Sequence, residues 1–182
     1  MKTKLLVFFS LIFIMTAYTY YQSKKIVSFS SAINVSILKD LPDTALKTLN
    51  GEPTSLHRVL INNQSKLILV HFWGTWCGPC ETEMPGLIEF VKKFNLVDLK
   101  IIFVTSNDTK QKIEKFFLKY GPLPDKITIL LDNEDGYLNT FGSTRVPETF
   151  LFNSHKLLIK QFTGPQDWGN PYYLGLFQEL SK

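Results

Sequence analysis

Residues Lys66–Cys80, which read KLILVHFWGTWCGPC, decide the fold of this chain. The first eight are almost continuously apolar and rich in β-branched and aromatic side chains, as a central strand covered on both faces requires. Apolar side chains then recur at helical spacing between Cys80 and Asn95, at Met84, Leu87, Ile88, Val91 and Phe94. The stretch therefore predicts a buried strand that leads directly into an amphipathic helix.

Strand-like and helix-like segments alternate through the rest of the chain. We expect strands at Leu99–Thr105, Ile127–Leu131, Thr149–Phe152 and Leu157–Phe162, and helices at Lys110–Tyr120, before Phe141 and from about Pro171. This alternation predicts an α/β domain with parallel central strands, and the last two strands form a hairpin that adds an antiparallel edge. A chain of 182 residues with 45% apolar content fits one domain of ordinary size.

The formal charge of +4 comes from the ends of an N-terminal apolar segment. Leu5–Tyr21 contains no charged residue, and a helix of that length spans about 25 Å, close to the hydrocarbon core of a bilayer. Four lysines flank this segment: Lys2, Lys4, Lys24 and Lys25. Without them, 16 basic residues balance 16 acidic ones, so the charge gives no support to nucleic-acid binding.

The apolar segment is interpreted as an uncleaved membrane anchor, with a removed signal peptide as the alternative. No small-residue cleavage site follows it directly, and no cysteine stands there for lipid attachment. We therefore expect three parts: an anchor or signal segment in residues 1–25, a polar linker in 26–37 and the α/β domain in 38–182. The anchor would place the domain on the extracytoplasmic, periplasmic side of the cytoplasmic membrane.

The only two cysteines, Cys77 and Cys80, form one C-x-x-C between the strand and the helix. A helix that starts there directs free backbone N–H groups and the positive end of its dipole at Cys77, which favours the reactive thiolate. The i, i+3 spacing lets the two sulfurs form a disulfide, and Pro79 is tolerated in the first turn. This arrangement favours reversible thiol–disulfide exchange, in which Cys77 attacks and Cys80 resolves the mixed disulfide.

Two other interpretations of the cysteine pair are weaker. A closed zinc site needs four ligands, and the histidines His57, His71 and His155 are not spaced as ligand pairs, so we expect no metal site. A structural disulfide across so short a loop would stabilise little. No cofactor is expected.

Several segments resemble a known family. Phe72–Cys80 (FWGTWCGPC) resembles the active-site segment of thioredoxin-fold proteins, and Cys80–Pro85 (CETEMP), with the leading apolar segment, resembles the membrane-anchored TlpA/ResA/DsbE-type thiol–disulfide oxidoreductases. Val146–Leu151 (VPETFL) is similar to the cis-proline segment of that family, and Leu41–Leu56 to its N-terminal hairpin. The resemblance, which covers about residues 38–182, implies a thioredoxin-like fold with a mixed sheet, an N-terminal β-hairpin and an inserted βα element.

The resemblance also implies roles for individual residues. Cys77 would be the attacking thiol, Cys80 the resolving thiol, and Pro147 a cis-proline that exposes a strand edge to the substrate backbone. The neighbouring residues that would support the site or contact substrate are Trp76, Gly78, Pro79 and Val146.

Two further titratable residues are candidates for proton transfer. Glu83 matches a buried glutamate of the family, and a buried carboxyl there would have a raised pKa and could relay protons to the thiols. The alternative is a solvated glutamate in the first turn of the helix, as we expect for Glu81. His71 is the only titratable side chain of its apolar strand, so it is expected to be buried, either as a proton carrier or as a hydrogen-bonded core residue.

The sequence thus predicts a membrane-tethered disulfide reductase. The Gly-Pro pair between the cysteines matches that of thioredoxin, a strongly reducing member of the fold. The resemblance implies disulfide-containing extracytoplasmic substrates, such as the haem-binding cysteines of apocytochrome c, and a membrane thiol donor of electrons. A thiol peroxidase of the same fold and a copper or zinc chaperone are the alternatives, although Gly74 stands where a peroxidatic T-x-x-C has threonine.

Overall fold

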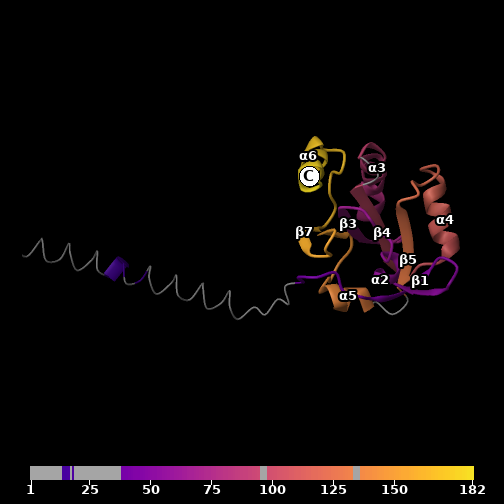
Figure 1. Cartoon of the computed structure of the whole chain (residues 1–182), viewed down its shortest axis with the longest axis horizontal. Coiled ribbons are helices and arrows are strands. Elements are labelled where there is room, and N and C mark those ends of the chain that lie inside the picture. Colours follow the sequence, from indigo (N-terminus) through magenta and orange to yellow (C-terminus); the bar gives the residue numbers. More distant parts are fainter. Residues whose placement is uncertain (1–13, 17, 19–37, 95–97, 133–135) are drawn as a thin grey trace, which may run out of the picture. The chain divides into compact units, whose positions relative to one another are not determined.

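A mixed sheet organises the computed structural model, which describes residues 14–16, 18, 38–94, 98–132 and 136–182 (Figure 1). Its strands are β1 (Ala45–Thr48), β2 (Pro53–Ser55), β3 (Leu67–Trp73), β4 (Leu99–Ser106), β5 (Ile127–Asp132), β6 (Glu148–Asn153) and β7 (Leu158–Thr163). In this described part the strand order is β2-β1-β5-β4-β3-β6-β7. Strands β3, β4 and β5 are parallel, while the β1–β2 and β6–β7 hairpins form antiparallel edges.

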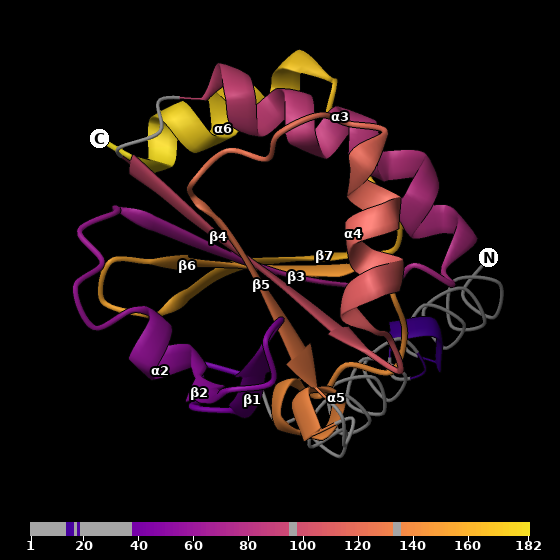
Figure 2. The same cartoon turned by 90° about the vertical axis from the view of Figure 1, so that its right-hand side faces the viewer.

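Helices cover both faces of the sheet (Figure 2). Their bounds are α2 (Leu56–Val59), α3 (Gly78–Lys93), α4 (Lys110–Leu118), α5 (Gly136–Phe141) and α6 (Pro171–Leu180). Helices α3, α4 and α6 share one hydrophobic core with alternate residues of β3, and α2 and α5 share a second core with the intervening residues. Every residue of β3 is therefore buried, which explains its unbroken apolar pattern.

This architecture confirms the predicted thioredoxin-like α/β fold, with the N-terminal hairpin at β1–β2 and the additional βα segment between α3 and β6. Two helix bounds differ from the prediction. Helix α3 begins at Gly78 rather than Cys80, because Cys77 is the N-cap and Pro79 fits the first turn, and α4 ends at Leu118 rather than Tyr120. The short helix α2 has no counterpart among the predicted elements. It places His57 in a helical turn.

The chain divides into two units, Met1–Ile37 and the sheet domain Leu38–Lys182. The predicted membrane segment Leu5–Tyr21 lies outside the described residues except at 14–16 and 18, and the predicted linker at 26–37 lies wholly outside them. No helix within the described residues has both the length and the hydropathy needed to cross a membrane.

Candidate active site

The two cysteines lie at the N-terminus of α3 and are joined by a disulfide. Their Cα atoms are 5.3 Å apart, and the Sγ of Cys77 accepts a hydrogen bond from the backbone N–H of Cys80 at 3.2 Å. Cys77 keeps 6% of its surface exposed and Cys80 none, while Gly78 and Pro79 between them are exposed. An incoming thiolate therefore reaches Cys77 first, and Cys80 is left as the buried leaving group.

The loop from β3 to α3 presents Cys77 and is held from a neighbouring loop. The Asp108 carboxylate accepts hydrogen bonds from the Thr75 backbone N–H and hydroxyl, both at 2.8 Å. The Trp76 indole donates to the Ser106 carbonyl at 3.0 Å yet remains 55% exposed beside the disulfide. Gly74 lies beneath that indole, where a Cβ would stand 2.6 Å from a ring carbon. Sequence reasoning missed Asp108, whose only local signal is that it precedes a helix cap.

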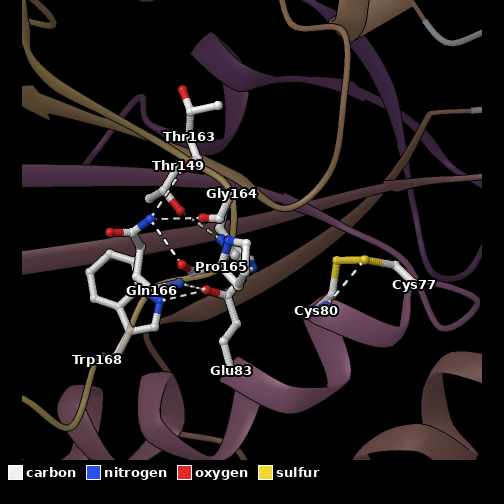
Figure 3. Close-up of polar contacts among 10 residues, drawn as sticks. Cys77, Cys80, Glu83, Thr149, Thr163, Gly164, Pro165, Gln166 and Trp168 are labelled. Carbon is white, nitrogen blue, oxygen red and sulfur yellow. Dashed lines mark hydrogen bonds and ion pairs between the residues drawn. A yellow bond between two sulfur atoms is a disulfide. The ribbon is translucent and has the colours of Figure 1, made fainter.

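Glu83 is buried on α3, one turn beyond Cys80 (Figure 3). Its Oε2 accepts hydrogen bonds from the Gln166 backbone N–H at 2.7 Å and from the Trp168 indole N–H at 3.1 Å. Burial nevertheless dominates and raises the pKa of Glu83 to about 7, although these two hydrogen bonds oppose the shift. The solvated alternative for this side chain is thus excluded. Glu81, by contrast, is exposed and pairs with Lys119 at the surface.

His71 points from β3 toward α3 because residues at odd positions of that strand face the helix. It is fully buried, and its Nδ1 lies 2.8 Å from the Thr149 hydroxyl on β6. Its Nε2 lies 3.5 Å from Oε1 of Glu83. Burial lowers the pKa of His71 to about 3, so the imidazole is neutral at physiological pH.

The Val146–Pro147 peptide bond is cis, and the segment lies at the same end of the sheet as the cysteines. Strands β3 and β6 pair antiparallel, and their last pair is Phe72 with Glu148. Pro147, directly before Glu148 in the chain, therefore lies one position beyond that pair, next to the end of β3. Pro147 is buried, and Val146 is half-buried against both hydrophobic cores. The fold thus places the segment at the end of β3 that leads into the loop carrying Cys77.

A buried carboxylate secures the segment after Pro147. Glu148 accepts hydrogen bonds from the side chains of Gln161 at 2.6 Å, Thr163 at 3.0 Å and Ser143. All three donors are neutral, and both carboxylate oxygens have partners. Sequence reasoning missed Glu148 because its partners come from β7 and from the turn before β6.

Other candidate groups do not join the site. His155 is exposed in the β6–β7 turn, and His57 bonds to the Leu41 carbonyl at 3.0 Å. Asp132 accepts a hydrogen bond from the Tyr137 backbone N–H, in the first turn of α5, at 2.7 Å. Among the described residues, no cluster of three or more His, Cys, Asp or Glu side chains is arranged as metal ligands.

The site combines a reversible cysteine pair, at the start of the helix that follows the central strand, with a buried carboxyl one turn away. Such a site can exchange disulfides and move a proton. This is the site of a thioredoxin-fold redox protein. The chain belongs to the AhpC/TSA family, whose model matches residues 37–161.

Individual relatives narrow the class further. The chain is 32% identical to thiol-disulfide oxidoreductase ResA of Geobacillus thermodenitrificans over 75% of its own length and 74% of that protein. It is 28% identical to ResA of Bacillus subtilis over 75% and 72%. The crystal structure of StoA from Bacillus subtilis shares the fold, with a TM-score of 0.55 and 24% identity over 78% of this chain and 97% of that one. The predicted resemblance to ResA-type thiol–disulfide oxidoreductases is confirmed.

Proposed function

We propose that this chain is an extracytoplasmic thiol–disulfide oxidoreductase that reduces disulfides in exported proteins, tethered to the membrane by the apolar segment Leu5–Tyr21. The observation that carries the proposal is the Cys77–Cys80 disulfide at the start of α3, with Cys77 on the solvent side. The flanking lysines and the length of the apolar segment support the tether. Support for apocytochrome c as a substrate comes from the family resemblance alone.

In the reducing direction, the Cys77 thiolate attacks one sulfur of a substrate disulfide. A Cys77–substrate disulfide forms, and the other substrate sulfur leaves as a thiol once it gains a proton. The Cys80 thiolate then attacks Sγ of Cys77, which releases the second substrate thiol and closes the Cys77–Cys80 disulfide. Two electrons pass from the cysteine pair to the substrate, and the backbone N–H groups at the start of α3 stabilise Cys77 as a thiolate.

Glu83 serves Cys80 in the proposed cycle. A membrane dithiol donor reduces the disulfide in two exchanges: its first thiolate attacks Cys77 and expels Cys80 as a buried thiolate, and its second thiolate then releases Cys77 and closes the donor's own disulfide. A carboxyl with a pKa of about 7 can give the Cys80 thiolate a proton and accept it back before the next resolving attack. The surface proposed to receive the substrate chain includes Trp76, Gly78 and Pro79, which flank the cysteines in the sequence, and Val146, which precedes the cis-proline.

Trapping tests the proposal directly. In the full-length Cys80→Ser variant, Cys77 can attack a substrate but nothing resolves the product, so a mixed disulfide with an extracytoplasmic protein should accumulate in cells. The matched control carries Cys77→Ser in addition and should capture nothing. Capture of equal amounts of protein by both variants, or a disulfide reductase rate in Cys77→Ser alone equal to that of the unmodified chain, contradicts the mechanism.

A further inference from the structure

Two buried side chains face each other between β3 and α3. Oε1 of Glu83 and Nε2 of His71 are 3.5 Å apart, and the two side chains are 2% and 0% exposed. Neither of these two atoms has a hydrogen-bond partner elsewhere in the described part of the chain. Two buried polar atoms without partners would cost the fold several kcal/mol in total, at about 1–3 kcal/mol each. The two atoms are therefore expected to satisfy each other.

The other polar atoms of both side chains are already committed. Nδ1 of His71 bonds with the Thr149 hydroxyl at 2.8 Å, and Oε2 of Glu83 accepts from Gln166 and Trp168. Figure 3 shows the Glu83 carboxyl among the residues of the 163–168 segment, beside the helix turn that carries Cys80. Both side chains are thus held in place at their far ends, and only Oε1 and Nε2 are left to form a contact.

The distance alone would fit an ion pair, but burial opposes two charges here. Burial keeps the pKa of His71 far below its ordinary value and that of Glu83 above it, so the uncharged forms are favoured. The nearby titratable groups are the cysteine pair on α3, Asp167 in the loop and Tyr173 on α6, whose hydroxyl bonds to Gln166. Among the described residues, no lysine or arginine forms an ion pair with Glu83 or His71.

We propose that His71 is the positioning residue for Glu83, and that the two side chains hold a single proton between Oε1 and Nε2. This inference rests on the proposed role of Glu83 as the proton donor to Cys80. With the carboxyl protonated, its O–H donates to Nε2, and Nδ1–H donates to the Thr149 hydroxyl. After the pair loses one proton, a neutral imidazole protonated at Nε2 donates to the carboxylate, and the Thr149 hydroxyl donates to Nδ1. One proton thus lies between Oε1 and Nε2 in both states, and Oε1, Nε2 and Nδ1 always keep partners.

Nuclear magnetic resonance of the oxidised full chain tests this arrangement, because the disulfide removes both thiols from the titration. Carboxyl carbons of Glu and ring nitrogens of His would be followed from about pH 5 to about pH 9, a range that brackets the Glu83 transition. We expect the Glu83 carboxyl signal and the His71 ring signals to change with one common midpoint, while the His71 ring stays neutral. In Glu83→Gln, the His71 signals should be constant across the range.

Two substitutions of histidine by asparagine separate the contact from general effects. His71→Asn removes the ring that accepts from the protonated carboxyl and donates to the carboxylate, so the Glu83 midpoint should shift by about one pH unit or more. His155→Asn changes an exposed histidine far from Glu83 in the sequence and should leave the midpoint unchanged. His71 signals that do not move as Glu83 titrates would overturn the proposal, and so would an unchanged midpoint in a folded His71→Asn. Should that variant fail to fold, the titrations of the unmodified chain and of Glu83→Gln decide.

The test also separates this inference from the proposed function. If His71 and Glu83 titrate together but Glu83→Gln leaves the reduction kinetics unchanged, the two side chains share a proton that Cys80 does not use. If the reduction kinetics depend on Glu83 but the His71 signals do not follow the Glu83 titration, Glu83 is the proton donor and His71 does not position it.

Discussion

At the scale of single residues, the site is built on asymmetry within two pairs. Cys77 is slightly exposed and Cys80 fully buried, so a thiolate formed at Cys80 has no water to stabilise it. Of the two glutamates near the start of α3, Glu83 is buried and Glu81 is exposed. The buried carboxyl keeps its proton up to a pH of about 7, and in the proposed cycle it neutralises the buried thiolate.

Replacement of the buried carboxyl should slow reduction of the disulfide in a pH-dependent way. In Glu83→Gln, we expect reduction by a small dithiol to slow by about 10²-fold, the lower range for loss of a general acid. The loss should be largest below about pH 7, where the unmodified carboxyl still carries its proton. Stopped-flow rates, corrected for the thiolate fraction of the reductant, measure this effect.

The matched control is Glu81→Gln, on the same helix but at the surface. It should leave both the rate and its pH profile unchanged. An inflection near pH 7 that persists in Glu83→Gln would show that another group donates the proton.

At the scale of elements, the active-site loop depends on a loop from the next strand. Residues 74–76 leave β3, while Asp108 stands between β4 and α4. Since β3 and β4 are parallel and adjacent, their C-terminal ends lie side by side, which lets Asp108 bond to Thr75. Asp108 also accepts from the hydroxyl of Thr105, so that one carboxylate joins the end of β4 to the loop that presents Cys77.

Removal of this carboxylate should weaken the fold at the active site. In Asp108→Ala, the Thr75 N–H and two hydroxyl groups lose their acceptor, so we expect a loss of about 1–3 kcal/mol in the free energy of unfolding. Urea denaturation of the oxidised protein measures it. Asp125→Ala, at an exposed position, is the control and should stay within about 0.5 kcal/mol of the unmodified chain. Equal stability of the two variants would contradict the anchoring role of Asp108.

At the scale of the whole molecule, Glu83 and His71 have opposite effects on the pH dependence of stability. The pKa of Glu83 rises from 4.5 to about 7 on folding, so its contribution is full below pH 4.5 and is lost as the pH rises through about 7. The pKa of His71 falls from 6.5 to about 3, so its contribution is full above pH 6.5 and is lost as the pH falls through about 3. Between pH 4.5 and 6.5, the pair binds one proton in both the folded and the unfolded chain, and its effects cancel.

Glu83→Gln should remove this cancellation. The folded variant then binds no proton at either position, whereas the unfolded chain still protonates His71 below pH 6.5. Relative to the unmodified protein, the variant should therefore lose about 1.4 kcal/mol of stability for each unit that the pH falls from 6.5 to 4.5. Urea denaturation of both oxidised proteins across this range measures the difference. A stability difference that does not change with pH would contradict these protonation states of Glu83 and His71.

Much of the fold follows from local patterns. The apolar run of β3, the helical spacing of α3 and the β6–β7 hairpin each express a period that the chain shows without any tertiary partner. The β1–β2 hairpin is predicted from the family resemblance. The burial of Glu83 agrees with its spacing from Cys80 and with the family resemblance. Apolar periodicity places the start of α3 two residues late, because a Cys at the N-cap and a Pro in the first turn give weaker signals than the apolar side chains that follow.

The sequence by itself determined that one cysteine couple stands between a buried strand and an amphipathic helix, because spacing along a few turns of chain encodes that arrangement. Only the tertiary structure decided what surrounds the couple. Thr149, Gln166 and Trp168 reach His71 and Glu83 from segments about 80 residues away, and Asp108 reaches the loop from about 30 residues away. No local period records such contacts, since they exist only after the sheet has paired and the helices have packed on its faces.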